Sequence, residues 1–350
     1  MILYKPKELP IPEEIRVAAK MGRLTFFIGA GVSRLYGLPS WEELANKMLL
    51  RLAECGKLNH SLVDLLTKYP TKVKISIADH YFTENRKEES HSQHPRLTYN
   101  SVLMDGISNK DIHKQIPVYT SIAKCNVKLL TTNYDSLLSD VLSSVAITDS
   151  FLAEAQIESD LPIESPARSK IFDYKIFRCL AELEESSLTQ NNILVHLHGS
   201  LNNEEALIAS TRSYLNFYGD KANQQRLTLL FQKQTVVFFG YGLEELEMLD
   251  LLLKSSTSEN VSPESPRFFL VLSLLSHELE ILKHLQIYYD QLGVRLLAFC
   301  RDTKGYLALA DVLDEWTKTL IPLVEHPSQV DHSLVMDQLR RQFNEILNDE

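Results

Sequence analysis

The 350-residue sequence predicts an α/β fold with a Rossmann-like, doubly wound and mainly parallel sheet that carries helical insertions. Short apolar runs of the β type alternate with longer stretches of helical spacing, which is the order that a parallel sheet requires. Several runs end in glycine or short polar residues, and ligands of open α/β sheets bind beyond the carboxyl ends of the strands. The expected strands are 24–28, 127–132, 193–197, 235–239, 268–272 and 294–299.

The first expected strand, 24–28, runs directly into a glycine turn, and a helix follows shortly after. Backbone N–H groups at such a turn suit a phosphate or pyrophosphate, and glycine lets the backbone approach the ligand. A tight turn without a ligand is the alternative interpretation. The turn consists of Gly29, Ala30 and Gly31.

The helix after this turn has recognisable ends. Ser40 is the expected N-cap, with Glu43 at the N3 position of a capping box. Gly56 suits the C′ position. The apolar residues at helical spacing are Leu44, Met48 and Leu52.

The remaining segments suggest one domain over residues 1–325 with insertions at about 57–120 and 143–190. Residues 60–120 are expected to be mostly helical, with a polar stretch at 84–94. The acidic segment 143–190 is expected to form an insertion or lid rather than part of the central sheet. Residues 326–350 contain an amphipathic helix (331–350) that would close the core or pack on another subunit.

Composition argues against several classes of protein. The net charge of −10 argues against nonspecific nucleic-acid binding and against an anionic membrane surface. No apolar run approaches the roughly 20 residues of a membrane span, and no signal-peptide h-region is found. The four cysteines lie singly, as is typical of reduced core residues, so a cytoplasmic protein is expected.

Two groups of polar residues at strand ends can carry chemistry. Asn133 and Asp135 follow the second strand, where they can orient a water or hold sugar and amide groups; the alternative is a turn bonded to its own backbone. His198 ends the third strand and suits a general base, against the commoner structural histidine. Alternation puts His196 on the same side, but no third metal ligand follows, so no metal is expected.

A second glycine turn, Gly240-Tyr241-Gly242, follows the fourth strand. Glu245, just beyond it, can accept hydrogen bonds from ribose hydroxyls, and helix capping is the alternative role. In the first turn, Arg34 stands where the dinucleotide fingerprint of dehydrogenases has a third glycine, which weakens that interpretation.

The order of these motifs resembles the sirtuin (SIR2) fold from about residue 20 to about residue 320. The chain looks most like the bacterial SIR2-like branch that hydrolyses NAD in defence against bacteriophages. The motifs are Gly29-Ala30-Gly31-Val32-Ser33, Gly37-Leu38-Pro39, Thr131-Thr132-Asn133-Tyr134-Asp135, Leu197-His198-Gly199-Ser200 and Gly240-Tyr241-Gly242-Leu243.

The resemblance implies roles for particular residues. Asn133 and Asp135 would face the nicotinamide and its ribose, and His198 would be the catalytic base. The first glycine motif would wrap the NAD phosphates, and the second would hold the adenosine half. The residues expected to bind NAD are Gly29, Ala30, Gly31, Ser33, Trp41, Thr131, Thr132, Gly240, Tyr241, Gly242 and Glu245.

The chain also departs from the deacylating sirtuins. It has no Cys-x-x-Cys pair of their zinc module, Ser40-Trp41-Glu42 replaces their Asp-Phe-Arg, and Thr132 replaces the Gln before the catalytic Asn. These differences disfavour protein deacylation.

The expected function is therefore an NAD+ glycohydrolase that yields nicotinamide and ADP-ribose in an abortive-infection system. Such an enzyme must be silent until triggered. Three means of control are expected: assembly into a homo-oligomer, a complex with a sensor protein such as an ATPase or a nucleotide-processing partner, or a nucleotide signal. A non-catalytic sensor of NAD or ADP-ribose is the main alternative, and ADP-ribosyl transfer is another.

Overall fold

The structure is a computed structural model that describes residues 2–87, 97–104, 117–144, 173–188, 190–231, 234–256 and 267–325. In these ranges seven strands form one parallel sheet in the order β3-β4-β2-β1-β5-β6-β7. The strands are β1 (Leu24–Ile28), β2 (Lys128–Thr131), β3 (Lys175–Phe177), β4 (Ile193–His196), β5 (Thr235–Phe239), β6 (Phe268–Leu274) and β7 (Val294–Cys300). The predicted Rossmann-like α/β fold is confirmed.

The central strand β1 lies where the strand order reverses. From β1 the chain builds one half of the sheet through β2, and it returns to the other side of β1 with β5. Ile28 pairs with Thr131 of β2 and with Phe239 of β5, so the three strands end level with one another. The segment after β1 packs on one face of the sheet and the helix after β5 packs on the other, and such a switch point opens a crevice for a ligand.

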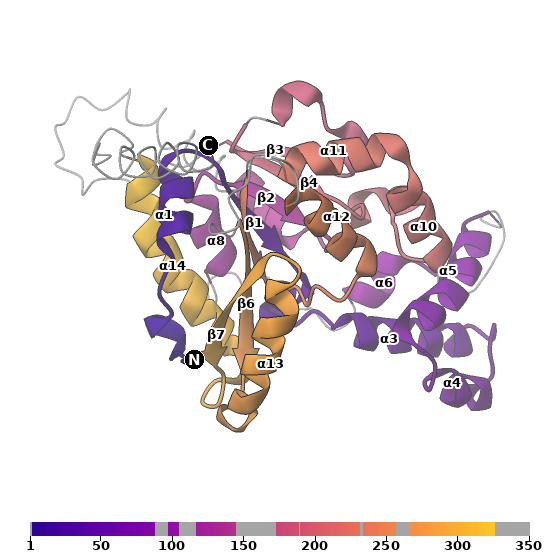
Figure 1. The fold of residues 1–350 in the computed structure, drawn as a ribbon. Coiled ribbons are helices and arrows are strands. Elements are labelled where there is room, and N and C mark those ends of the chain that lie inside the picture. The colour runs from indigo at the N-terminus through magenta and orange to yellow at the C-terminus, as the bar shows by residue number, and fades with distance from the viewer. Residues whose placement is uncertain are drawn as a thin grey trace, which may run out of the picture.

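Helices cover both faces of the sheet (Figure 1). One face carries α1 (Glu13–Lys20), α8 (Val118–Ala123) and α14 (Ala308–Glu325). The other carries α11 (Lys221–Phe231), α12 (Leu246–Ser256) and α13 (Leu279–Asp290). Short 3-10 helices connect these elements at Pro6–Glu8, Leu180–Glu182, Glu185–Ser187, Leu201–Ala206, Ser276–Glu278 and Gly305–Leu307.

A group of helices extends beyond the sheet on one side of the molecule (Figure 1). Its members are α3 (Trp41–Glu54), α4 (His60–Leu66), α5 (Thr71–Lys87), α6 (Tyr99–Leu103) and α10 (Thr211–Gly219). The fully buried Lys74 of α5 fastens the group, because its ammonium contacts Glu42 and lies 2.9 Å from Oδ1 of Asn46, both on α3. The predicted helical character of residues 60–120 is confirmed in the described part.

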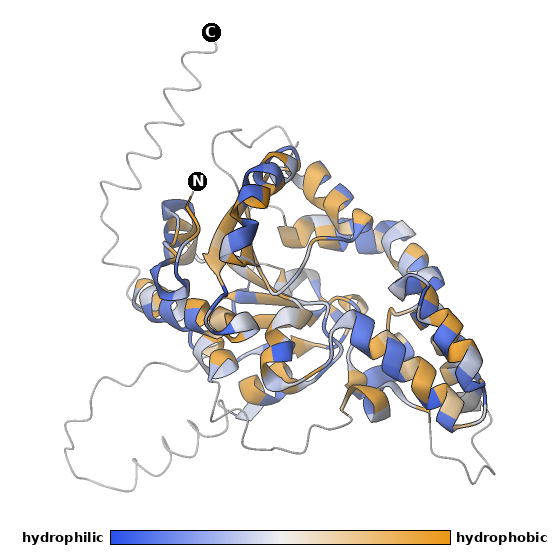
Figure 2. Cartoon of the chain, turned by 90° about the horizontal axis from the view of Figure 1, so that it is seen from below, coloured by the Kyte–Doolittle hydropathy of each residue, from blue (hydrophilic) through white to orange (hydrophobic). Residues whose placement is uncertain are grey.

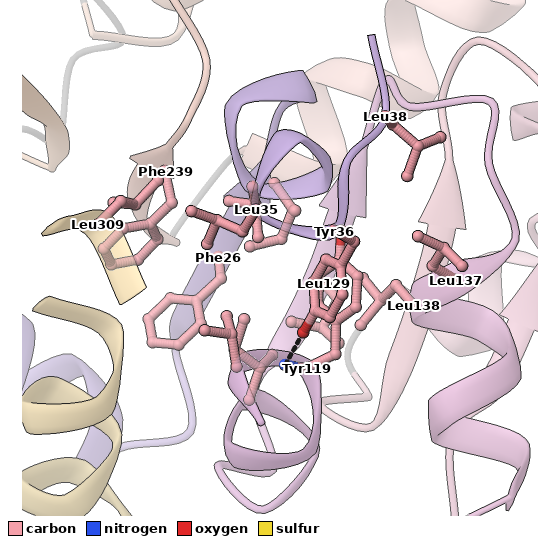
Figure 3. Close-up of a cluster of buried hydrophobic side chains, with 14 of the residues drawn as sticks. Phe26, Leu35, Tyr36, Leu38, Tyr119, Leu129, Leu137, Leu138, Phe239 and Leu309 are labelled. Carbon is pink, nitrogen blue, oxygen red and sulfur yellow. Dashed lines mark hydrogen bonds between the residues drawn. The ribbon is translucent and has the colours of Figure 1, made fainter. Parts of the chain in front are cut away.

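The core consists of two apolar clusters, one on each face of the sheet. Figure 3 shows part of the first cluster, where Phe26 of β1 and Phe239 of β5 pack between helices. Their rings meet edge to face with centroids 5.2 Å apart. In the same cluster Tyr36 stacks on Tyr119 at 4.6 Å, and its hydroxyl accepts the Tyr119 N–H at 3.0 Å. Figure 2 shows the apolar strands between helices that are polar on one side.

The predicted ends of the helix over residues 41–54 are confirmed. The Ser40 hydroxyl accepts the Glu43 N–H at 3.2 Å, and the Glu43 carboxylate accepts the Ser40 N–H at 2.6 Å. Gly56 follows the helix at φ +68°, a conformation that glycine adopts without strain.

One expectation about the sheet is wrong. Residues 175–177, placed in a lid, form the edge strand β3, which pairs in parallel with β4. An edge strand is less buried than a central strand, so it can form without a continuous apolar run. Such a run is the pattern by which a central strand is recognised in a sequence. The segment 145–172, most of 84–94 and the predicted helix 331–350 lie outside the described residues.

Among the helices that are described, none is long and apolar enough to cross a membrane.

Candidate active site

The two glycine turns cross each other at the switch point. The Gly31 N–H donates to the carbonyl of Gly240 at 2.8 Å, and a Cβ on Gly31 would lie 2.7 Å from Gly240 Cα. Gly240 has a φ of +62°, and a Cβ there would lie 2.5 Å from the Val32 nitrogen. Glycine is therefore required for the contact between the loops, a reason that the sequence interpretation did not include.

The first turn leads into a short helix, α2 (Ala30–Ser33), which continues as a 3-10 turn over Arg34–Tyr36. Val32, Leu35 and Tyr36 are buried and anchor this segment in the core. The chain then leaves through Gly37, at φ +86°. The anchoring places Ser33 beneath the loop that follows β2.

The Ser33 hydroxyl joins three polar side chains. It donates to Oδ2 of Asp135 at 2.8 Å, and it accepts from Nδ2 of Asn133 at 2.8 Å. The Tyr119 hydroxyl lies 3.0 Å away, and it donates because the Ser33 proton is already committed to Asp135. Asn133 and Asp135 are thus held as one unit.

Asp135 is 4% exposed. Burial raises the pKa of its carboxyl, while the bonds from the Ser33 hydroxyl and the Leu137 N–H favour the ionised form. Burial is the larger effect, so this carboxylate is unusually ready to take up a proton.

Two neighbours hold the backbone of Asn133. The Thr131 hydroxyl accepts the Asn133 N–H at 3.0 Å and donates to the Ile28 carbonyl at 2.8 Å. The His196 Nδ1 lies 3.1 Å from the Asn133 carbonyl, and its Nε2 lies 2.8 Å from the Ser139 hydroxyl. Since a carbonyl only accepts, Nδ1 carries the proton and Ser139 donates to Nε2. His196 therefore supports the Asn133 loop.

His196 and His198 do not contact the same side chains, although strict alternation would place them on one side. β4 ends at His196, so the period of two does not extend to His198. His198 lies instead among the aromatic side chains of α10.

Both ring nitrogens of His198 meet tyrosine hydroxyls. Nε2 lies 2.8 Å from the Tyr218 hydroxyl, and Nδ1 lies 3.2 Å from that of Tyr214. The imidazole is 1% exposed, and burial lowers its pKa to about 3. The imidazole is therefore neutral at physiological pH. The sequence interpretation missed the tyrosines, whose only signal is their i, i+4 spacing on the next long helix.

Glu245 lies at the far side of Tyr214. The Tyr214 hydroxyl donates to Oε1 of Glu245 at 3.4 Å, and Oε2 of Glu245 has no hydrogen-bond partner among the described residues. Burial raises the pKa of this carboxyl, and the Tyr241 hydroxyl and the Lys72 ammonium act in the opposite direction. Lys72 lies 4.8 Å from the centre of the Tyr214 ring.

Asn133, Asp135, His198, Tyr214 and Glu245 line one cavity of about 690 Å³, which falls in the usual range for small-molecule sites. Trp41 lies at its wall, with its ring 5.6 Å from that of Tyr134. Gly29 and Thr131 are absent from the lining and act as supports. The predicted site residues that do line the cavity are Ala30, Gly31, Ser33, Trp41, Thr132, Asn133, Asp135, His198, Gly240, Tyr241, Gly242 and Glu245.

The other end of the cavity lies at the carboxyl ends of β6 and β7. Ser273, Phe299 and Tyr306 form its wall there, and the guanidinium of Arg34 lies 4.5 Å from the centre of the Tyr306 ring. Over the described ranges, no group of three or more His, Cys, Asp or Glu side chains is arranged to hold a metal ion.

Residues 127–289 match the family model of the SIR2-like domain. Over this segment the chain is therefore similar to SIR2-like domains. The matched segment includes Asn133, Asp135, His198 and the second glycine turn, whereas the first glycine turn precedes it. The SIR2-like match and the parallel sheet together agree with the sirtuin-like fold expected from the motifs.

The chain is also similar to Defense-associated sirtuin 2 of Bacillus subtilis, with 24% identity over 329 residues. The similarity covers 89% of this chain and 26% of that protein. The chain thus spans about a quarter of the length of the curated relative that it matches. Because the similar region extends over most of the chain, it includes elements on both sides of the SIR2-like match.

Proposed function

We propose that the protein is an NAD+ glycohydrolase that cleaves the bond between nicotinamide and ribose. The observation that carries this proposal is the convergence of Asn133, Asp135 and His198 with the crossed glycine turns on one cavity. An extended dinucleotide suits a cavity that runs from His198 to Tyr306 along the carboxyl edge of the sheet. NAD+ is here the substrate, not a resident cofactor, and the SIR2-like domain supports that choice.

Cleavage of the bond between nicotinamide and ribose depends mainly on the positions of the reacting groups and on stabilisation of the charge that develops on the sugar. Nicotinamide leaves as a neutral molecule from a positively charged pyridinium, and the sugar acquires oxocarbenium character, as in glycoside hydrolysis. A carboxylate and amide held close to the reacting sugar stabilise that charge without reorganisation. Asp135 and Asn133, joined through Ser33, are suited to this role because their orientations are fixed before substrate binds.

Asn133 and His198 would share the handling of water and ribose. The bond to Ser33 uses Nδ2 of Asn133, so Oδ1 remains the atom to accept a hydrogen bond from water or a ribose hydroxyl. His198 would take a proton from that hydroxyl or from the water. Trp41, at the cavity wall, would shield the reactive sugar carbon from bulk solvent.

The biological role that we propose is defence against bacteriophages by depletion of NAD+. Similarity to Defense-associated sirtuin 2 supports a defence role. An enzyme of this kind is harmful to its own cell unless restrained, so we propose control by self-assembly, by a sensor protein or by a nucleotide signal.

The test uses the protein isolated together with whatever copurifies with it, incubated with NAD+ labelled in the adenine ring. We expect free nicotinamide and free labelled ADP-ribose, with NAD+ binding retained in Asn133→Ala. Label attached to a protein or nucleic acid would instead indicate ADP-ribosyl transfer. Binding of NAD+ without any nicotinamide release would indicate a sensor and contradict the proposal.

A further inference from the structure

Both ring nitrogens of His198 are in hydrogen bonds with tyrosine hydroxyls, so one of these bonds must break before the ring can accept a proton from the substrate. Nε2 meets Tyr218 at 2.8 Å, and Nδ1 meets Tyr214 at 3.2 Å. The Tyr214 hydroxyl also lies 3.4 Å from Oε1 of Glu245. A continuous chain of hydrogen bonds therefore connects the imidazole to a carboxylate at the cavity wall.

With Glu245 ionised, these hydrogen bonds take one consistent set of donors and acceptors. An ionised carboxylate only accepts, so Tyr214 donates its proton to Glu245. The Tyr214 oxygen then accepts from His198, which places the ring proton on Nδ1. Nε2 is left without a proton and accepts from Tyr218. The network thus assigns the Nδ1–H tautomer to His198.

We propose that Tyr214 and Glu245 form a proton relay that removes the proton taken up by His198. The inference rests on the proposed NAD+ cleavage. The step requires the buried Tyr218 side chain to turn away from Nε2. A ribose hydroxyl or water then takes its place, the O–H bond of that group breaks and an Nε2–H bond forms. The Nδ1 proton passes to the Tyr214 oxygen as the Tyr214 proton passes to Oε1 of Glu245. His198 and Tyr214 end neutral, Glu245 ends protonated, and the negative charge stays on the substrate oxygen.

The groups around His198 disfavour a positively charged imidazolium, and this favours transfer of its proton to Glu245. Burial of His198 opposes its positive charge, and the Lys72 ammonium beside Tyr214 opposes it further. Lys72 also pairs with Glu247 at 3.6 Å, and the hydroxyls of Tyr134, Tyr218 and Tyr241 also lie near Glu245. The relay moves the proton to Glu245, whose carboxyl has a pKa raised by burial.

Glu245 is placed to end the relay. Its Oε2 is buried without a hydrogen-bond partner among the described residues, and its side chain lines the cavity. Tyr214 and Glu245 act through His198, so they are positioning residues rather than catalytic ones.

The kinetic test compares Glu245→Gln, Tyr214→Phe and the double variant, each isolated with its copurifying partners. Each single variant is expected to lower kcat by about 100-fold with little change in KM, since a general base contributes on that scale. The double variant is expected to be no slower than either single one, because both interrupt the same path. Glu280→Gln, at an exposed carboxylate on α13, is the matched control and keeps wild-type kcat.

The pH profile separates a relay from a merely structural role. Wild-type kcat is expected to fall on acidification as Glu245 becomes protonated, at a pH above the ordinary range of Glu because burial raises its pKa. Glu245→Gln loses this acidic limb. Thermal melting of each variant checks that the fold is retained.

Nitrogen-15 NMR of the imidazole tests the relay without turnover, with the His198 signals assigned by His198→Gln. We expect the Nδ1–H tautomer in the wild type and a mixture in Glu245→Gln, whose amide can donate or accept. An Nε2–H tautomer, additive kinetic effects or unchanged kcat in Glu245→Gln would overturn the relay and leave NAD+ cleavage standing. A wild type that releases no nicotinamide would overturn both.

Discussion

The side-chain amide of Asn133 donates a hydrogen bond of 2.8 Å to the Ser33 hydroxyl. This bond joins the loop after β2 to the short helix after β1, two segments that meet because their strands are neighbours in the sheet. The Ser33 hydroxyl in turn donates a hydrogen bond to Asp135, so the first glycine motif contributes a side chain that orients both predicted site residues. The motif therefore does more than open a backbone turn for a phosphate.

Ser33→Ala tests this relationship. The substitution removes the partner of Asn133 and Asp135, and we expect the free energy of unfolding to fall by about 1–3 kcal/mol. The rate of nicotinamide release should fall as well, because both side chains lose their fixed orientation. Denaturant unfolding and a nicotinamide assay on the same preparation measure the two effects. Ser143→Ala, which removes an exposed hydroxyl bonded to a helix carbonyl, is the control and should change neither strongly.

Gly31→Ala tests the crossing of the two glycine turns. A Cβ at this position would lie 2.7 Å from Gly240 Cα, so the loops must separate. We expect weaker NAD+ binding in titration calorimetry and a lower unfolding free energy. Gly219→Ala is the matched control, since nothing lies within 4 Å of its Cβ position at the end of α10. Removing glycine there should leave binding intact and stabilise the protein by a few tenths of a kcal/mol, up to about 1 kcal/mol.

The two tryptophans should separate function from stability. Trp316 is 1% exposed, and its indole donates to the Leu9 carbonyl at 3.0 Å. Trp316→Ala should cost about 3–5 kcal/mol of stability. Trp41 lies at the cavity wall, so Trp41→Ala should cost about 1 kcal/mol and lower the rate of NAD+ cleavage. Equal losses of stability in the two variants would contradict this assignment.

The burial of His198 should appear in the pH dependence of stability. Its pKa falls from 6.5 to about 3 on folding, so between these values the unfolded chain binds a proton that the folded chain does not. Above about pH 6.5 the titration of His198 does not affect the free energy of unfolding. As the pH falls below that value, proton uptake by the unfolded chain lowers the stability of the protein. Wild type should therefore lose about 2 kcal/mol more than His198→Phe between about pH 7 and about pH 5. Parallel stability curves would show that the histidine titrates normally in the folded protein.

Much of the fold could be predicted because its strands are buried on both faces. β1 and β5 coincide with the predicted apolar runs, and the capping box of Ser40 follows from local hydrogen bonding alone. β3 could not be predicted in this way, because a three-residue edge strand has no distinctive apolar pattern. Its pairing with β4 is a property of the assembled sheet.

That several candidate residues meet at one cavity could also be predicted from the sequence. Asn133, His198 and Gly240 each follow a strand, and parallel strands bring their carboxyl ends to one edge. The hydrogen bonds of Tyr214 and Tyr218 to His198 depend instead on how α10 packs against the end of β4. Neither residue stands in a motif, so helical spacing alone gave no reason to connect them with the histidine.

The most direct test of the central claim measures nicotinamide and ADP-ribose after NAD+ is incubated with the protein isolated together with its copurifying partners. The predicted result is one nicotinamide and one free ADP-ribose for each NAD+ consumed, with release at least about 100-fold slower in Asn133→Ala and in His198→Ala, both still folded. No nicotinamide from the wild type, or equal release by both variants, would contradict the account.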